Sequence, residues 1–485
     1  KIDQEVAFLD YREKAPLTAH KNMYLNDQGD VINNITLVGG QAAGVPGTVA
    51  GFWEAHQRFG QLPWKDLVQP AIELADKGFV PAPILVESIH SMEQRFEGKT
   101  NFNDYFNSIS SDSLFRQPEL ANTLRRIAEF GADDFYRGET AALIVQQMEK
   151  SNGLISLEDL DAYSAVWRAP VRAGWRDYEI ISAPPPSSGG FAIVQLLKMK
   201  DDLYELFEGV EHNSAQYIHL VAEMEKRVFA DRAEYLGDPD FFDIDIDALI
   251  DDDYLARRAA AVNPKAISVL DSVNPGLESP NTTHYSIVDQ WGNAVSNTYT
   301  INWDYGSGVV VGGAGFLLNN EMDDFSAKPG TPNIYGVVGS VANEIQPGKR
   351  MLSSMSPTIV LKGGEVEMVL GTPGGSTIFT TVFQVITNIL DFGMSVEEAI
   401  GIARFHHQLV PPDLITYSGF TIGQYLPKAT VADLLERGYR SEPHSFEYGD
   451  VQIIMRSGDS WIAASDPRDR GQSRVFEVTT KTRDR

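Results

Sequence analysis

The spacing of apolar and polar residues predicts that the first half of the chain is mainly helical. Apolar residues recur every three or four positions between Pro46 and Gly60, and proline and glycine suit the start and the end of a helix. Residues 64–77 repeat the pattern, and residues 215–235 form a longer helical candidate. The segment 156–159 resembles a capping box before a short helix, because its serine is followed three positions later by an acidic residue.

The second half of the chain changes to the alternating pattern of strands. Three pairs of alternating segments are each separated by a short turn, which predicts hairpins. These pairs are residues 283–289 and 294–301, residues 356–361 and 365–370, and residues 451–455 and 461–464. Residues 376–392 and 395–405 are expected to form two consecutive helices. Hairpins interleaved with helix pairs predict antiparallel sheets covered by helices, an α+β fold.

Composition and charge exclude several classes of protein. The 485 residues allow two to four domains at roughly 100–200 residues each, or one large fold. Lys and Arg number 40 and Asp and Glu 67, and the net charge of −27 argues against a general affinity for nucleic acid or anionic membranes. The chain has no cysteine, which excludes thiol catalysis, disulfides and cysteine-based metal sites. No apolar run is long enough for a membrane-spanning helix.

Two segments have the composition of metal sites without the required pattern. In the acidic segment 238–253, three aspartates at alternate positions from Asp243 match the start of a calcium loop. Ala248 takes the place of the required glycine, and Tyr254 that of the bidentate glutamate, so a solvated acidic loop is the better interpretation. Residues 406–407 are adjacent histidines, which do not share a helix face, and no zinc motif surrounds them. We therefore expect no metal site and no cofactor.

Four short segments carry candidate chemistry, each with a structural alternative. Thr282 opens a predicted strand; as a new N-terminus it would be a nucleophile whose own amine serves as base, although spacing alone favours a structural role. The N–H groups of Gly374 and Gly375, between a strand and a helix, would suit an oxyanion, and a tight turn is the alternative. Residues 353–354 are serines that loop polarity explains. The aspartates 323–324 fit either a helix N-terminus or an amine site.

Eight short motifs, taken in order, resemble those of gamma-glutamyltranspeptidase, a family of N-terminal nucleophile hydrolases. The resemblance covers essentially the whole chain. The motifs are residues 10–16 (DYREKAP), 45–51 (VPGTVAG), 184–190 (PPPSSGG), 235–241 (YLGDPDF), 282–286 (TTHYS), 317–325 (LLNNEMDDF), 352–357 (LSSMSP) and 373–376 (PGGS). Each motif is short, and it is their joint order that carries the resemblance.

The resemblance implies a fold and a maturation step. The fold would be a four-layer αββα sandwich, in which two stacked antiparallel sheets are flanked by helices. The bond between Asn281 and Thr282 would be cut autocatalytically, giving a large subunit (residues 1–281) and a small catalytic subunit (residues 282–485) that stay together as a heterodimer. Before cleavage the nitrogen of Thr282 is an amide and cannot act as a base, so the uncut chain should be inactive. Family members carry a further upstream stretch, and the resemblance implies a periplasmic or secreted location.

The resemblance also implies residue roles. Thr282, supported by Thr300, would attack the γ-carbonyl of glutathione or another γ-glutamyl compound, with Gly374 and Gly375 as oxyanion-hole amides. Water, an amino acid or a dipeptide would then resolve the acyl-enzyme. The expected substrate-binding residues are Arg12, Ser353 and Ser354 for the α-carboxylate, Asn302, Glu321 and Asp324 for the α-amine, and Tyr335 in a lid over the site.

Two alternative functions remain on the same fold. A glutaryl-type cephalosporin acylase acts on a substrate without an α-amine, and Asp324 argues against it, because an anion facing no cation is poorly compensated in a closed pocket. A non-catalytic γ-glutamyl-binding protein would have no need for cleavage after Asn281.

Overall fold

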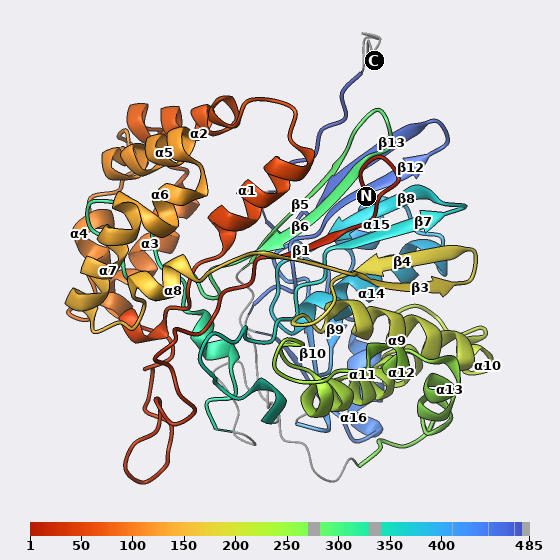
Figure 1. The fold of residues 1–485 in the computed structure, drawn as a ribbon. Coiled ribbons are helices and arrows are strands. Elements are labelled where there is room, and N and C mark those ends of the chain that lie inside the picture. Colours follow the sequence, from red (N-terminus) through yellow and green to blue (C-terminus); the bar gives the residue numbers. More distant parts are fainter. Residues whose placement is uncertain (270–281, 329–340, 410, 445, 470, 478–485) are drawn as a thin grey trace.

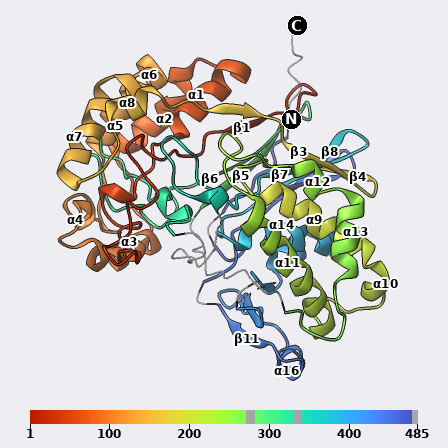
Figure 2. The ribbon, with the colours of Figure 1, turned by 60° about the horizontal axis from the view of Figure 1, so that its bottom comes forward.

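The computed structural model describes residues 1–269, 282–328, 341–409, 411–444, 446–469 and 471–477 (Figure 1). Most helices lie in two separate groups, one at the left of Figure 1 and one at its lower right, and Figure 2 shows the same separation. The first group is α1 (Thr48–Phe59), α2 (Trp64–Lys77), α3 (Pro83–Phe96), α4 (Phe102–Phe106), α5 (Pro118–Phe130), α6 (Ala132–Arg137), α7 (Glu139–Ser151) and α8 (Leu157–Asp161). The second group is α9 (Gly189–Asp202), α10 (Tyr204–Phe207), α11 (Ala215–Tyr235), α12 (Ile246–Leu249) and α13 (Asp252–Ala260).

An antiparallel six-stranded sheet joins the two halves of the chain. Its strand order is β13-β12-β8-β7-β4-β3. The strands are β3 (Val171–Trp175), β4 (Tyr178–Ser182), β7 (Thr358–Lys362), β8 (Glu365–Gly371), β12 (Gln452–Ser457) and β13 (Ser460–Ser465). β4 pairs with β7 in the middle of the sheet, so a hairpin from the first half of the chain completes a sheet from the second half.

The two faces of this sheet are buried by different partners, as the alternation of strand side chains requires. Val360 and Leu370 point into the main core, which they share with α9, α11 and α14 (Thr377–Leu390). Ile359 and Val369, one position earlier on each strand, pack on the opposite face against Ala294. That second face is covered by the hairpin of β5 (Thr283–Val288) and β6 (Ala294–Tyr299). A two-stranded ribbon is therefore stacked on the six-stranded sheet.

Two smaller sheets and the remaining helices complete the fold. β1 (Phe8–Asp10) pairs with β2 (Val166–Arg168), and β10 (Leu414–Ser418) lies between β9 (Arg404–His406) and β11 (Arg440–Pro443). The other helices are α15 (Val396–Gly401), α16 (Lys428–Glu436) and three 3-10 turns at Gly40–Ala42, Glu321–Asp324 and Val341–Asn343. Across the described residues, no helix combines the length and apolar character needed to cross a bilayer.

Most predicted elements are confirmed, including the α+β class. Helices α2 and α11 have the predicted bounds, the three hairpins form, and Ser156 and Asp159 make the predicted capping box of α8. The prediction of one helix over residues 395–405 is wrong in its second half. α15 ends at Gly401, and Arg404–His406 becomes β9 because it pairs with β10, a long-range contact that overrides local propensity.

The acidic segment 238–253 is also more ordered than a solvated loop. Its Asp245 and Asp251 side chains cap two short helices, accepting hydrogen bonds from the backbone N–H of Ala248 and Tyr254 at the starts of α12 and α13. Aspartate suits this position because it satisfies a helix N–H that has no partner within the helix. Part of the acidity of the segment therefore has a structural cause.

Candidate active site

The register of the β5–β6 hairpin brings Thr282 next to Thr300. Thr283 pairs with Tyr299, so the residues just beyond these strands face each other. The Thr282 hydroxyl donates to the Thr300 hydroxyl across 3.4 Å, a long hydrogen bond. The Thr300 hydroxyl also accepts the backbone N–H of Asn302 at 2.8 Å. The hairpin thus presents two adjacent threonine hydroxyls at the edge of the stacked ribbon.

A glycine turn follows β8 and approaches the same point. Gly371 ends β8 against the ring of His284 on β5, where a Cβ atom would come within 2.3 Å of the ring, so only glycine fits. Gly374 and Gly375 have φ angles of 141° and 57°, in the region that favours glycine. Their N–H groups have no acceptor among the described residues, and Gly375 lines the same pocket as Thr282. The turn therefore leaves two N–H groups without an acceptor among the described residues, and Gly375 lies in the pocket of the threonine hydroxyls.

Arg12, just after β1, is one of two buried arginines that line this pocket, and Arg232 is the other. Its Nη1 lies 2.7 Å from Glu321 Oε2, and its Nη2 forms an ion pair with Asp324. Nη2 also donates to the backbone carbonyl of Leu352 at 3.2 Å. Burial alone would lower the pKa of Arg12, but the neighbouring carboxylates more than reverse this and raise the pKa above its usual value. The guanidinium therefore stays charged.

Three buried carboxyl groups surround this single guanidinium. Besides Glu321 and Asp324, Glu13 lies 3.9 Å from Arg12 Nη1. Burial raises the pKa of Glu13 to about 7, raises that of Asp324, and raises that of Glu321 well above its usual range, although Arg12 opposes all three shifts. Arg232, the second buried arginine of the pocket, also lowers the pKa of Asp324, but the two cations only partly offset the effect of burial. Three carboxyl groups still outnumber two cations, so the cluster would accept a further cation.

Serine hydroxyls form the other wall of the pocket. The Ser353 hydroxyl accepts the backbone N–H of Met355 at 3.0 Å, and the Ser354 hydroxyl accepts Arg232 Nη2 at 3.1 Å. Both serines line a cavity of about 30 Å³ together with Arg12 and Thr282. Asn302, whose Nδ2 donates to the carbonyl of Asn320 at 3.0 Å, also lines it.

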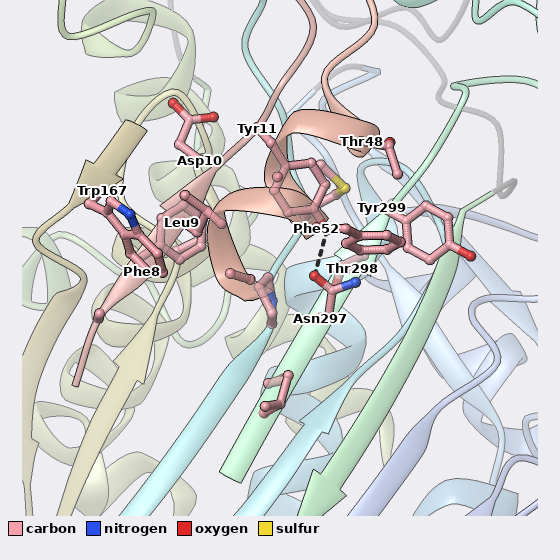
Figure 3. A pocket seen from close by; sticks show the side chains of 18 of the residues that line it. Phe8, Leu9, Asp10, Tyr11, Thr48, Phe52, Trp167, Asn297, Thr298 and Tyr299 are labelled. Carbon is pink, nitrogen blue, oxygen red and sulfur yellow. Dashed lines mark hydrogen bonds between the residues drawn. The ribbon is translucent and has the colours of Figure 1, made fainter. Parts of the chain in front are cut away.

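Two larger cavities adjoin this pocket. One of about 650 Å³ includes Thr282 and Thr300 and has apolar walls such as Leu124 and Phe316. The other, of about 500 Å³, lies between α1, β1 and β6, where Phe8, Tyr11, Phe52 and Tyr299 converge (Figure 3). In this second cavity the Tyr11 hydroxyl donates to Asn297 Oδ1 at 2.5 Å. Thr282 therefore lies between a small polar pocket and a large, mainly apolar space.

Comparisons with known proteins identify the family. The sequence profile of the family described as Gamma-glutamyltranspeptidase matches residues 1–476. The chain belongs to the gamma-glutamyltranspeptidase family. It is 56% identical over 478 residues to the glutathione hydrolase proenzyme of Pseudomonas aeruginosa, covering 98% of this chain and 85% of that protein. It is 42% identical over 472 residues to the enzyme of the same name from Escherichia coli, covering 95% and 80%. The chain is thus an enzyme of this family.

Solved structures agree with this assignment to the gamma-glutamyltranspeptidase family. The chain resembles the gamma-glutamyltranspeptidase from Pseudomonas nitroreducens complexed with L-DON, with a TM-score of 0.54, 53% identity and coverage of 55% of this chain and 80% of that chain. It also resembles the cephalosporin acylase from Bacillus halodurans, with a TM-score of 0.82 and coverage of 99% and 86%. That second protein is only 23% identical, so it shows a shared fold and nothing about the substrate.

The structure brings together most of the site residues predicted from the gamma-glutamyltranspeptidase motifs. Thr282, Thr300, Gly375, Arg12, Asn302, Asp324, Ser353 and Ser354 line one pocket. Glu321 contacts it through Arg12, and Gly374 precedes Gly375 in the turn. Asn281 and Tyr335 lie outside the described residues, so the cleavage site and the lid stay predictions.

The structure also shows the contacts of several side chains whose roles the sequence left open. Asp323 accepts a hydrogen bond from the buried Thr36 hydroxyl, whereas Asp324 pairs with Arg12. His406 and His407 are buried, and burial lowers their pKa values to about 3 and about 4, so they are neutral structural groups. Arg232 was not predicted from sequence. No signal in the sequence marks it, because its role depends on burial, which only the fold reveals.

Proposed function

We propose that this gamma-glutamyltranspeptidase transfers the γ-glutamyl group of glutathione and similar compounds to water or to amino acids and dipeptides through an acyl-enzyme on Thr282. The observation that carries the proposal is the composition of the pocket beside Thr282. Two guanidinium groups, of Arg12 and Arg232, and two serine hydroxyls lie beside a cluster of buried carboxyl groups. The α-carbon of a γ-glutamyl compound bears one anion and one cation, and this pocket offers partners for both.

The chemistry begins with the free amine of Thr282. After cleavage of the Asn281–Thr282 bond, the amine takes the proton of the Thr282 hydroxyl as Oγ1 attacks the γ-carbonyl carbon. The Gly374 and Gly375 N–H groups stabilise the resulting oxyanion. When the tetrahedral intermediate collapses, the C–N bond breaks and the proton passes to the leaving amine. Water or an acceptor amine then attacks the ester by the same steps in reverse order and frees Thr282.

Substrate binding rearranges the charges around Arg12. In the ligand-free pocket Arg12 pairs directly with Glu321 and Asp324, and the cavity of about 30 Å³ is too small for an amino-acid head group. We propose that the α-carboxylate displaces part of this pairing and binds Arg12 with the two serine hydroxyls. The α-ammonium then compensates Glu321 and Asp324, with Asn302 beside them.

The apolar space next to Thr282 offers room for the rest of the substrate. Its volume of about 650 Å³ falls within the range of ordinary ligand pockets, about 300–1,000 Å³. Because Thr282 lines both this space and the small polar pocket, a γ-glutamyl group bound in the latter would direct its leaving amine into the former. The acceptor would enter by the same route.

Maturation and architecture complete the proposal. We propose that residues 1–281 and 282–485 are separated by autocleavage and stay together as a heterodimer with a four-layer αββα arrangement. The contacts between β4 and β7, on opposite sides of the cut, support the persistence of the pair. We also propose a lid containing Tyr335, and a periplasmic or secreted location as inferred from the family motifs.

A covalent-labelling experiment tests the mechanism. The protein is trapped with a slow γ-glutamyl substrate, denatured and analysed by mass spectrometry. A γ-glutamyl adduct should appear on the 282–485 fragment, at Thr282. A single band near the intact mass of 53.6 kDa, unlabelled under native conditions, would favour a binding protein instead.

A pair of anilides separates this function from that of an acylase. The γ-glutamyl and glutaryl anilides differ only in the α-amine, which is the group that Asp324 is proposed to bind. We expect the γ-glutamyl anilide to be turned over faster. Preference for the glutaryl anilide would contradict the proposed substrate while leaving the Thr282 mechanism intact.

A further inference from the structure

Arg232 connects the two serines of the pocket to the helical layer beneath them. It lies near the end of α11, is 4% exposed, and reaches the pocket that holds Thr282. Its Nη2 donates to the Ser354 hydroxyl at 3.1 Å, and its Nε donates to the Ser188 hydroxyl at 3.0 Å. One buried guanidinium therefore holds two serine side chains from different segments.

The direction of each hydrogen bond follows from the chemistry of arginine. A guanidinium has donors only, whereas a serine hydroxyl has one donor and two acceptor positions. Because Arg232 donates to Ser354, the hydroxyl oxygen accepts and its hydrogen must point to another group. The part of the chain that the structure describes provides no acceptor for that hydrogen within hydrogen-bond distance. The Ser354 hydroxyl is thus left as a donor at the wall of the pocket.

Through its hydrogen bond to Ser188, Arg232 also fixes the position of Ser353, the serine next to Ser354. The Ser188 hydroxyl accepts from Arg232 and passes its own hydrogen to the Ser353 carbonyl at 2.9 Å. The Ser188 backbone N–H donates to the same carbonyl at 2.8 Å. The Ser353 hydroxyl already accepts the Met355 N–H at 3.0 Å, so it too has a hydrogen to donate. Both hydroxyls are prepared for a ligand that only accepts hydrogen bonds.

A carboxylate is such a ligand, since an ionised carboxyl group has acceptors only. We propose that Arg232 is a positioning residue that fixes the Ser354 hydroxyl as a donor to the substrate α-carboxylate and holds Ser353 through Ser188. The inference rests on the proposed function, because it concerns the same γ-glutamyl head group. Arg232 acts through the serines and does not itself contact the reacting atoms.

The main test compares Arg232→Met, which keeps the apolar stem and removes the donors, with the unmodified enzyme. Two anilide substrates are used: γ-glutamyl anilide, and 4-aminobutyryl anilide, which has the amine but no α-carboxylate. We expect the KM for γ-glutamyl anilide to rise about tenfold with little change in kcat, because a hydrogen bond to a charged group is lost in binding. The KM for 4-aminobutyryl anilide should change less than twofold.

A double-mutant cycle with Ser354→Ala tests whether Arg232 acts through that serine. In the Ser354→Ala background, Arg232→Met should raise the KM much less than it does alone. Arg258→Met is the matched control, since Arg258 pairs with the adjacent Asp231 at 2.6 Å and does not line the pocket. If Arg232→Met does not fold, Arg232→Lys replaces it in the cycle. Lysine cannot donate hydrogen bonds to both Ser188 and Ser354 in the planar geometry of arginine.

The outcomes separate the inference from the proposed function. An equal loss for both anilides, or an undiminished loss in the Ser354→Ala background, would overturn the positioning role and leave the proposed function standing. Such a result would point to the charge of Arg232, which favours the ionised form of Asp324 and so contributes to amine binding. Absence of γ-glutamyl turnover in the unmodified, cleaved enzyme would overturn both.

Discussion

The two ends of the pocket differ in how completely the folded chain arranges them. At the binding end, Arg12, Ser353 and Ser354 are held by short ion pairs and hydrogen bonds. At the reacting end, the Thr282 and Thr300 hydroxyls are 3.4 Å apart, and the N–H groups of the glycine turn have no acceptor among the described residues. Under the proposed mechanism, folding therefore supplies most of the groups that bind the substrate, whereas reactivity depends on the Thr282 amine, which only the proposed cleavage would supply. Substitutions at the two ends should consequently separate kcat from KM.

The largest effect is expected at the reacting end. Thr282→Ala removes the nucleophile, and the kcat for γ-glutamyl anilide should fall on the order of 10⁴-fold or more, as for other catalytic nucleophiles. The variant should also remain as one band on a denaturing gel. Thr283→Ala is the control, because Thr283 is the exposed first residue of β5. A cleaved and active Thr282→Ala enzyme would refute the assignment of the nucleophile.

The position of Thr282 shows what local patterns can predict. The alternation of residues 283–289 and 294–301 predicted the hairpin, and its register then places Thr282 opposite Thr300. The helices at residues 64–77 and 215–235 were predicted with their bounds for the same reason, since periodicity and terminal glycines are local signals. β9 was missed because its strand conformation depends on β10, which no local pattern encodes.

The binding end could not be predicted from spacing. Arg12 and Asp324 are 312 positions apart, and nothing in the local sequence of either relates it to the other. Only the family motifs predicted that both residues bind the substrate head group. The structure adds that the two side chains form an ion pair. Arg232 carried no motif-based expectation, because on a helix it resembles any solvated arginine until burial is known. Long-range polar contacts are thus the part of the site that requires the fold.

The second largest effect is expected at the binding end. Arg12→Met should raise the KM for γ-glutamyl anilide about a hundredfold, because the proposed charge-assisted contact with the α-carboxylate is lost. It should also destabilise the protein by about 3–5 kcal/mol, since Glu321 and Asp324 lose their buried partner. Steady-state kinetics and urea unfolding measure the two effects. Arg12→Lys should be intermediate in both, and equal KM values for all three proteins would remove Arg12 from substrate binding.

A smaller effect should distinguish the two walls of the binding end. Asp324→Asn keeps the shape of the side chain and removes the charge that is proposed to face the α-ammonium. The kcat/KM for γ-glutamyl anilide should fall roughly ten- to hundredfold, and that for glutaryl anilide should fall less or rise. Competition between the two anilides measures the ratio directly. Asp323→Asn is the matched control, because Asp323 accepts from Thr36 instead. An unchanged ratio in Asp324→Asn would place the amine elsewhere.

The smallest effect concerns protons at the carboxyl wall. Burial raises the pKa of Glu13 from 4.5 to about 7, so between these values the folded ligand-free protein binds more protons than the unfolded chain. The stabilisation from protonated Glu13 is complete below about pH 4.5 and is lost as the pH rises through about 7, so the free energy of unfolding should fall over this range. Urea unfolding at several pH values measures the slope, and Glu13→Gln, which cannot titrate, should flatten it. An unchanged slope in Glu13→Gln would mean that Asp324 or Glu321, beside the same guanidinium, carries the proton. In that case Asp324 or Glu321, and not Glu13, would be the carboxyl group at the binding end that stays protonated.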